Sequence, residues 1–359
     1  MTETSTEPIH DKLVFVCHEK PFTVREIIDA AHFRAEVEPI WRNLLRIAAA
    51  EAKADAQELE FDDETIDAAV EKFRYEHDLI TAEETEKWLA DRGTTLADFS
   101  GYFVRHYWHD RFDDIEDEEQ DLATADSAMR DLLTAELLFS GELDQMAIRL
   151  SWRVAAFREA AKADVDPALI EEQRKQFFDR AGLKETALPS WLEKFGRGEE
   201  WWREALAMEA VYHRDRLALL SQQARAHELA ALRLPLTRFE VETVELDSLD
   251  AAREALLCAR DDGMTMEEVA AEGRYPYRHP EVLLEEIPED LQQKFLSVHP
   301  GDILDPIARG DGFHLCRIVG KHEPNVEDPD VQKRADQRII DRHFSELITR
   351  HIQWRTLLA

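Results

Sequence analysis

The stretch Phe239-Glu-Val-Glu-Thr-Val-Glu-Leu246 alternates apolar and acidic residues over most of its length. A period of two predicts a β-strand with one face in a core. Ser248 follows as the expected N-cap of a helix that runs to Leu257. Thr265 and Glu268 have the spacing of a capping box, which predicts a second, short helix. The strand is therefore expected to be followed directly by two helices.

The sequence beyond these helices completes a small domain. A third helix is expected over Pro288–Phe295 and a turn over His299–Asp302. Two closing strands are expected over Ile303–Ile307 and Gly312–Val319. One strand, three helices and a hairpin within Leu236–Lys321 predict an α+β domain.

This order resembles the parvulin-type (PpiC/SurA-like) peptidyl-prolyl isomerase domain of SurA- and PrsA-like folding factors. Gly301-Asp-Ile-Leu-Asp-Pro-Ile307 is similar to the family turn Gly-Glu-x-x-x-Pro-Val. Gly312-Phe-His-Leu-Cys-Arg-Ile-Val319 is similar to the final strand, Gly-x-His-Ile-Ile-x-Val. Met264-Thr-Met-Glu-Glu-Val-Ala270 stands where the family has Asp-Phe-x-x-Leu-Ala.

The sequence departs from the family pattern at its active site. Thr243, or Glu242 in a shifted register, replaces the His of the first strand. Gly273–Pro280 stands in place of the Gly-Gly-Asp-Leu-Gly segment. The Phe that lines the family's proline pocket falls on Leu291, and Phe295 is the nearest ring. The resemblance therefore implies a parvulin-like fold with a degenerate active site.

The site that the resemblance implies has five residues. His314 and Thr243 are the catalytic candidates, and Ile287, Leu291 and Phe295 are the substrate-binding candidates. Such a site twists an X–Pro amide, whose rotational barrier is about 18–20 kcal/mol, and needs no nucleophile, metal or cofactor. The equally weighted alternative is that His314 is a structural strand residue that is hydrogen-bonded to the first strand.

Composition limits the partners of the chain. The 359 residues include 44 Lys and Arg and 77 Asp and Glu, so the formal net charge is −33. This acidic protein should repel nucleic acid and anionic membranes. Three cysteines are too few and too scattered for a disulfide framework or a zinc site. The first residues show no signal-peptide pattern and no apolar run is long enough to span a membrane, so we expect a cytoplasmic protein.

An internal repeat organises the sequence before the parvulin-like domain. Six apolar or glycine positions recur at an offset of 104 residues, which becomes 103 at the tryptophan: Ile66, Phe73, Leu79, Trp88, Leu89 and Gly93 are matched by Ile170, Phe177, Leu183, Trp191, Leu192 and Gly196. Asp62 and Asp166 are the expected caps of the two copies. By resemblance, the copies are two helical modules like the N-terminal domain of SurA.

The whole chain is predicted to be α+β and mostly helical, with five regions. These are a first helical module (1–112), an acidic linker (113–135), a second helical module (136–235), the parvulin-like domain (236–322) and a C-terminal helix (323–359). The acidic run Asp113–Asp121 places the linker, because like charges at that density extend a chain.

Local patterns mark further elements at both ends of the modules. A strand and turn over Leu13–Phe22 should lead into a helix, with Thr23 and Glu26 as its capping box. Glu200–Leu234 is expected to be one long helix, and Val331–Leu358 another. The second of these should bury its apolar residues against the helical modules, since no later strand is expected.

His106 and His109 lie one helical turn apart, and acidic residues follow them. This spacing is compatible with a divalent metal, but no third ligand motif is visible, so no metal site is predicted.

Three functions fit these observations. The first is a cytoplasmic chaperone that binds peptides or unfolded protein segments, with weak or absent isomerase activity. The second is an active peptidyl-prolyl cis-trans isomerase in which Thr243, Tyr275 or His279 replaces the missing residues. The third is an accessory protein that binds a precursor peptide in a peptide-maturation (RiPP-type) system.

Overall fold

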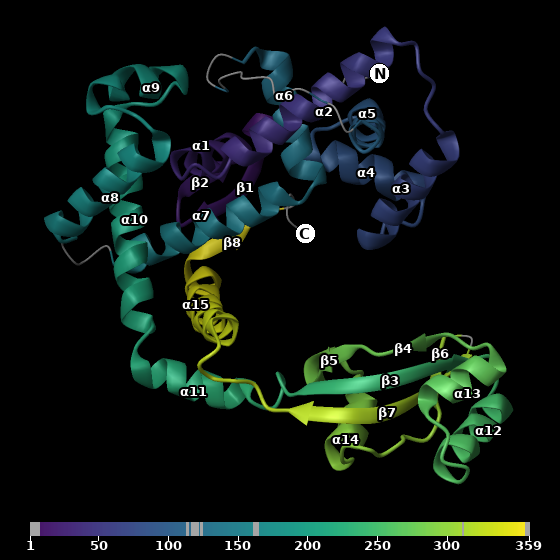
Figure 1. Cartoon of the computed structure of the whole chain (residues 1–359). Helices are drawn as coiled ribbons and strands as arrows, with labels where there is room; N and C mark the ends of the chain where they lie inside the picture. Colours follow the sequence, from purple (N-terminus) through teal and green to yellow (C-terminus); the bar gives the residue numbers. More distant parts are fainter. Residues whose placement is uncertain are drawn as a thin grey trace. The chain divides into compact units, whose positions relative to one another are not determined.

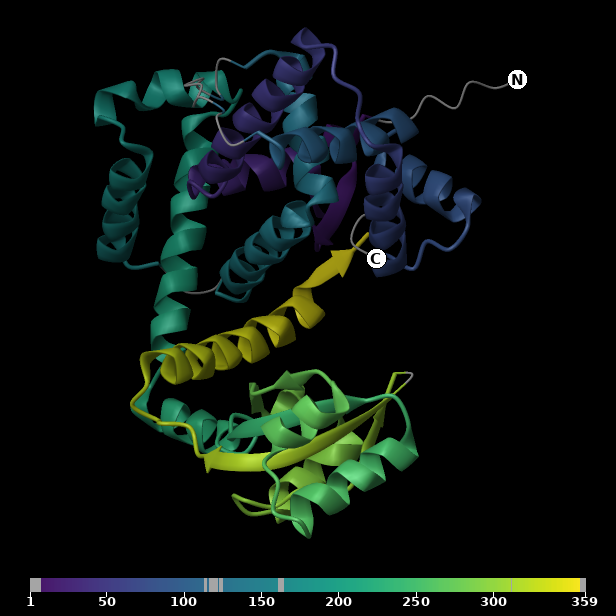
Figure 2. The same ribbon diagram turned by 45° about the vertical axis from the view of Figure 1, so that its right-hand side comes forward.

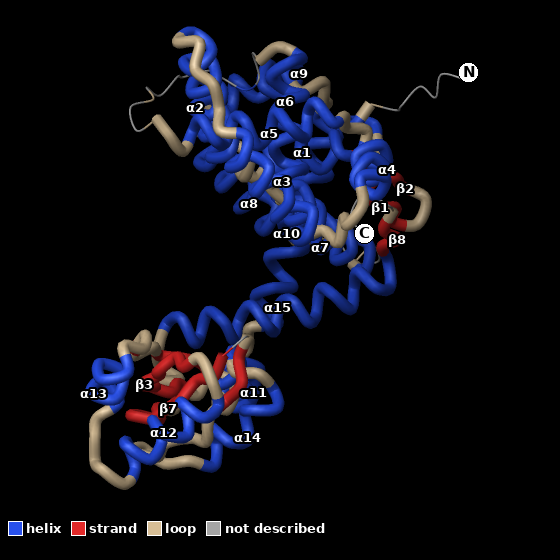
Figure 3. The backbone as a smooth tube through the Cα atoms, turned by 90° about the vertical axis from the view of Figure 1, so that its right-hand side faces the viewer, coloured by secondary structure: helices blue, strands red, loops and turns tan. Residues whose placement is uncertain are grey.

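The computed structural model describes residues 8–112, 115, 122, 125–160, 165–310 and 312–355. The architecture is α+β and mostly helical, as predicted, with strands confined to two small sheets (Figure 3). The chain divides into two compact units. Unit 1 comprises Met1–Leu217 and Arg342–Ala359, and unit 2 comprises Ala218–Asp341. None of the described helices combines the length and apolar character needed to cross a membrane.

Unit 1 begins with the strand pair that the sequence predicts. After a short 3-10 turn, β1 (Leu13–Cys17) and β2 (Lys20–Thr23) form an antiparallel pair that leads into α1 (Val24–Phe33). The predicted capping box is present, and the backbone N–H of Thr23 donates to the Glu26 carboxylate at 2.9 Å. The Glu26 carboxylate thereby satisfies the backbone N–H of the N-cap residue and fixes the start of the helix.

Two similar sets of helices make up most of unit 1 (Figure 1). The first copy contains α2 (Glu38–Ala56), α3 (Asp63–Glu76), α4 (Ala82–Arg92) and α5 (Leu96–His109). The helix α6 (Ser127–Phe139) then connects to the second copy, which contains α7 (Glu142–Glu159), α8 (Pro167–Ala181), α9 (Leu188–Lys194) and α10 (Glu199–Leu219).

The two copies share their detailed geometry. Phe73 meets Trp88 edge to face with ring centroids 5.7 Å apart, and Phe177 meets Trp191 in the same way at 5.3 Å. Gly93 and Gly196 both have left-handed backbone conformations, with φ of 74° and 62°. A helix that ends in this conformation strongly favours glycine, which has no Cβ to clash.

The helix before each copy packs onto the other copy. Phe33, at the end of α1, stacks on Phe177 of the second copy with centroids 4.9 Å apart. Phe139, at the end of α6, lies 5.6 Å from Phe99 of the first copy. The two copies therefore share a core: α1, which precedes the first copy, supplies a ring to the second, and α6, which precedes the second copy, supplies a ring to the first.

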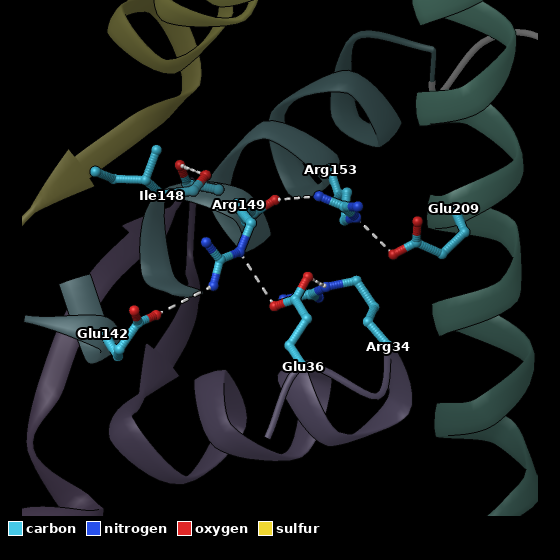
Figure 4. Close-up of polar contacts among 8 residues, drawn as sticks. Arg34, Glu36, Glu142, Ile148, Arg149, Arg153 and Glu209 are labelled. Carbon is cyan, nitrogen blue, oxygen red and sulfur yellow. Dashed lines mark hydrogen bonds and ion pairs between the residues drawn. The ribbon is translucent and has the colours of Figure 1, made fainter. Parts of the chain in front are cut away.

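A partly buried ion network lies at the end of α1 (Figure 4). Arg34 Nε donates to Glu36 at 2.8 Å, Arg149 Nε donates to the same carboxylate at 3.2 Å, and Arg153 Nε donates to Glu209 at 2.5 Å. Burial alone would raise the pKa of Glu36, but the hydrogen bond and charge of Arg34 and the charge of Arg149 hold it below its usual value. The network joins the end of α1 to α7 and α10.

The end of the chain completes unit 1. The helix α15 runs from Pro329 to His351, and in its second half Phe344 is fully buried, 5.7 Å from Trp152 and 4.9 Å from Tyr212 between ring centroids. After α15, β8 (Ile352–Trp354) adds to the free edge of β1 and gives a sheet of order β2-β1-β8 (Figure 2).

We predicted one helix over Val331–Leu358 with no strand after it, and this is wrong beyond His351. There the chain forms a strand because its backbone pairs with the free edge of β1. The last residue of that expected helix, Leu358, lies outside the described residues.

Unit 2 is built on two long antiparallel strands. These are β3 (Arg238–Leu246) and β7 (Gly312–His322). On the other edge of β3 lie β4 (Tyr277–Arg278) and β5 (Glu281–Leu283), and β6 (Ile307–Arg309) lies on the other edge of β7. The helices α12 (Leu249–Arg260) and α13 (Met266–Gly273) cover one face of the sheet, and α14 (Glu289–Ser297) packs against the opposite face.

Unit 2 also contains a pair of helices, α11 and the first half of α15. The helix α11 (Gln222–Leu232) contributes Leu232 to an apolar cluster with Ala335 of α15. Arg225 binds Asp336 through two hydrogen bonds of 2.7 Å, and Arg338 Nε lies 2.8 Å from Glu228.

Three further expectations need correction. The predicted single helix Glu200–Leu234 is two helices, because the Ser221 hydroxyl caps α11 by accepting from Ala224 N–H. The predicted strand Ile303–Ile307 is reduced to one bridge at Ile303 and the start of β6. The predicted linker 113–135 ends earlier, because α6 begins at Ser127. Most of its acidic run lies outside the described residues.

Candidate functional site

The residues of the predicted site gather on one face of the sheet in unit 2. Thr243 of β3 is paired in register with Cys316 of β7, and the hydroxyl Oγ1 lies 3.9 Å from the thiol Sγ. His314 lies two residues before Cys316 and so points to the same face of β7. The structure therefore places both catalytic candidates on one face of the sheet, and their role in catalysis stays a prediction.

The ionisation of this face does not favour nucleophilic chemistry. Burial raises the pKa of the Cys316 thiol, so the group is a neutral thiol at neutral pH. Burial, together with the positive charge of Arg309, lowers the pKa of His314, so its imidazole is also neutral at that pH. Such groups can form hydrogen bonds, but they supply no fixed charge to a twisted amide.

The three substrate-binding candidates belong to the core beneath this face. Ile287 and Phe295 are only 7% and 5% exposed, and Phe295 meets Phe239 edge to face with centroids 5.5 Å apart. Leu291 is half-buried and packs against the same cluster. Two of the three side chains are thus held by the sheet and α14, and Leu291 keeps the most surface for a ligand. Their role in binding peptide stays a prediction.

The other residues considered for an active isomerase lie apart from His314. Tyr275 packs against the apolar cluster beneath α12 and α13, on the opposite face of the sheet. His279 Nε2 lies 3.1 Å from the Glu240 carboxylate. Neither side chain replaces the missing first-strand histidine in this arrangement.

A second candidate site lies in unit 1, between the two helical copies. Trp41 of α2 and Trp191 of α9 line a pocket of about 470 Å³, which we call the tryptophan pocket. Its remaining side chains include the apolar Ala181, Leu183 and Ala187 and the basic Arg42, Arg180 and Lys194. The volume falls within the range of roughly 300–1,000 Å³ that is usual for ligand sites.

The position of Trp191 is fixed from two sides. The His32 ring stacks on it with centroids 5.5 Å apart and an interplanar angle of 8°, and Phe177 contacts it edge to face. Sequence reasoning identified Trp191 only as a repeat position. The sequence carries no local signal for the pocket, because Arg42, Arg180 and Lys194 are far apart in the chain and are brought to Trp191 only by folding.

The two histidines of α5 have other partners. His106 Nε2 lies 2.9 Å from Glu136 Oε1, and His109 Nδ1 lies 3.6 Å from Asp110. Within the described part of the chain, no group of three or more His, Cys, Asp or Glu side chains has the geometry of a metal site.

Comparison with known proteins gives matches among solved structures. No family model matches the chain, and no curated protein matches it. The peptidylprolyl isomerase PrsA of Bacillus cereus is 12% identical, with 64% of this chain and 90% of that chain covered and a TM-score of 0.32. PrsA of Bacillus anthracis is 12% identical over 57% of this chain and 96% of its own, with a TM-score of 0.28.

A structure from a study of the SurA-like chaperones PEB4 and Cj1289 of Campylobacter jejuni is 8% identical over 60% of this chain and 88% of its own, with a TM-score of 0.20.

Proposed function

We propose that this chain is a cytoplasmic, chaperone-like protein that binds extended peptide segments and has weak or absent prolyl isomerase activity. The observation that carries the proposal is the tryptophan pocket of unit 1. The partly exposed Trp191 ring and the aliphatic side chains offer an apolar surface for one client side chain, with the buried Trp41 behind them. Burying such a side chain contributes about 1.5–3 kcal/mol. Arg42 and Arg180 on the same pocket can donate hydrogen bonds to client carbonyl or carboxylate oxygens.

The face around His314 supports weak rather than efficient isomerisation. Catalysis requires interactions that are stronger with the twisted amide than with the planar one. Here the polar groups on the face include a neutral histidine, the Glu245 carboxylate that is paired in register with it, and a buried Thr243–Cys316 pair. Ile287 and Phe295 are committed to the core. A client side chain at Leu291 would gain burial without transition-state stabilisation.

Unfolded protein segments are the proposed client class, and a precursor peptide of a RiPP-type maturation system is one member of that class. The binding chemistry is the same for both, because each presents an extended backbone with exposed apolar side chains.

The test uses the internal repeat as its control. Trp191→Ala removes a wall of the tryptophan pocket, whereas Trp88→Ala removes the repeat-equivalent ring, which packs on Phe73 in the same edge-to-face manner outside that pocket. Binding of both variants to fluorescently labelled, reduced and carboxymethylated α-lactalbumin is measured by anisotropy. We expect Trp191→Ala to weaken binding at least tenfold and Trp88→Ala to leave it within twofold. Equal effects of the two changes would refute the assignment of the pocket.

A further inference from the structure

The tryptophan pocket is lined by more basic than acidic side chains. The basic ones are Arg42 of α2, Arg180 near the end of α8 and Lys194 at the end of α9, and all three residues are exposed. The acidic one among the described residues is Glu38. The lining is therefore positively charged in a chain whose formal net charge is −33.

The two arginines of the pocket are open to a ligand. Neither Arg42 nor Arg180 forms an ion pair or a hydrogen bond with another described residue. Because both residues are exposed, their guanidinium groups can donate to an oxygen acceptor at the pocket without giving up a contact within the fold.

The carboxylate of the pocket is held beside a histidine. Glu38 Oε1 lies 2.8 Å from His32 Nδ1, and Glu38 Oε2 is buried without a hydrogen-bond partner. The His32 ring in turn stacks on Trp191. The carboxylate therefore belongs to the aromatic wall of the pocket and pairs with neither arginine.

The first copy of the repeat reverses the charge at two of these positions. At the offset of 104 residues Arg180 corresponds to Glu76, and at the offset of 103 residues Lys194 corresponds to Asp91. The tryptophan between them is the same in both copies. The helical hairpin therefore forms with either sign of charge around its tryptophan.

The hairpins as wholes also differ in charge. Residues 63–92 include ten acidic and four basic residues, a net charge of −6, whereas residues 167–195 include five of each. Both stretches form the same edge-to-face contact between a phenylalanine and a tryptophan. Since the fold does not require the cations of the second copy, their role is to be sought in what the pocket binds.

We propose that the tryptophan pocket selects client segments in which an acidic side chain stands next to a large apolar one. The apolar side chain packs on Trp191 and the aliphatic wall, and the carboxylate accepts hydrogen bonds from Arg42 and Arg180. A guanidinium can donate two parallel hydrogen bonds to one carboxylate, which suits arginine to this role. The proposal rests on the proposed function, because it names the client class of the same pocket.

The charge of the whole chain favours the opposite client. A net charge of −33 attracts basic segments and repels acidic ones. At physiological ionic strength this field is largely screened beyond about 8 Å, whereas hydrogen bonds within the pocket act at shorter range. The pocket and the overall charge therefore predict opposite preferences, which one comparison can separate.

Three capped heptapeptides provide that comparison. Each has the sequence Gly-Ser-Leu-Xaa-Leu-Ser-Gly, in which Xaa is Glu, Gln or Lys, so the first two peptides differ in charge at nearly constant shape. They are titrated by calorimetry at physiological ionic strength into the full chain, into Trp191→Ala and into the double variant Arg42→Gln/Arg180→Gln. The control is Lys175→Gln/Lys333→Gln, which removes the same charge from two exposed lysines that do not line the pocket.

We expect the Glu peptide to bind the unaltered chain about fivefold or more tightly than the Gln peptide, and the Lys peptide to bind more weakly than either. The preference for Glu over Gln should fall below about twofold in Arg42→Gln/Arg180→Gln and persist in the lysine control. The melting temperatures of both double variants should match that of the unaltered chain, because all four residues are exposed.

The Trp191→Ala variant separates failure of this proposal from failure of the proposed function. Equal binding of the Glu and Gln peptides that is lost in Trp191→Ala would keep the pocket as a peptide site and overturn its acidic preference. Binding of both peptides that is unchanged in Trp191→Ala would overturn the pocket itself. A preference for the Lys peptide, or a Glu preference that survives in Arg42→Gln/Arg180→Gln, would also overturn the acidic preference.

Discussion

Phe344→Ala should destabilise unit 1 selectively. Phe344 lies on the second half of α15, has no exposed surface, and contacts the rings of Trp152 on α7 and Tyr212 on α10. Truncating a buried phenylalanine costs about 3–5 kcal/mol, from lost burial and the cavity that remains. Both ring contacts disappear together, so we expect the upper part of this range. For a domain of 150–250 residues, about 2–4 °C of melting temperature is lost per kcal/mol, which predicts a shift of roughly 8–20 °C.

Hydrogen exchange measured by mass spectrometry separates the two units. Phe344→Ala should increase amide exchange in α7, α10 and β1 and leave β3 and β7 protected. Phe295→Ala, which removes a core ring of unit 2, should give the reciprocal pattern. Unchanged protection of α7 and α10 in Phe344→Ala would show that the second half of α15 contributes little to unit 1, and the reasoning from burial would fail.

Three other predictions concern charge and catalysis. Glu209→Gln should lower the free energy of unfolding in urea by about 3–5 kcal/mol, because it leaves Arg153 buried without its ionic partner. Glu204→Gln breaks an exposed pair and should lower it by about 1 kcal/mol or less. Equal losses would contradict the burial argument. Burial, opposed by the charge of Arg92, raises the pKa of Asp144 to about 6, so the stabilisation from its protonated form is present below its unfolded pKa and is lost as pH rises through 6. Asp144→Asn should therefore raise the melting temperature at pH 7.5 and not at pH 4. A lower melting temperature of the variant at pH 7.5 would refute this prediction. Isomerisation of a proline tetrapeptide should be slow or undetectable and unchanged by His314→Ala; a robust rate that collapses in the variant would establish the enzyme.

Local sequence patterns predicted much of the fold. The capping boxes at Thr23 and Thr265 form as expected, because each is decided within four residues. The repeated Phe and Trp positions also have one geometry in both copies, since the same residues close the same helical hairpin. The alternation in β7 places His314 and Cys316 on the face opposite Leu315.

Features that depend on distant partners were not predictable in the same way. Ile352–Trp354 continues a helical pattern, and only the free edge of β1 makes it a strand. Arg105 lies in an aromatic helix, where an arginine is usually exposed, and its burial follows from the packing of α6 and the N-terminal segment. Thr243 and His314 lie on one face of the sheet, but the burial of Ile287 and Phe295 was not predictable from the sequence, because it depends on the packing of α14 against that face.

The pairing of β1 with β8 has a consequence for synthesis on the ribosome. Residues 13–17 emerge first, but their partners, residues 352–354, emerge only after all of unit 2. Translation adds about 5–20 residues per second, so roughly 7–30 s pass between the synthesis of Leu217 and that of β8. Until then the edge of β1 and the surface that contacts Phe344 have no partner from the end of the chain. During that interval the nascent chain presents an open strand edge, so this protein should need protection by a chaperone until β8 pairs with β1.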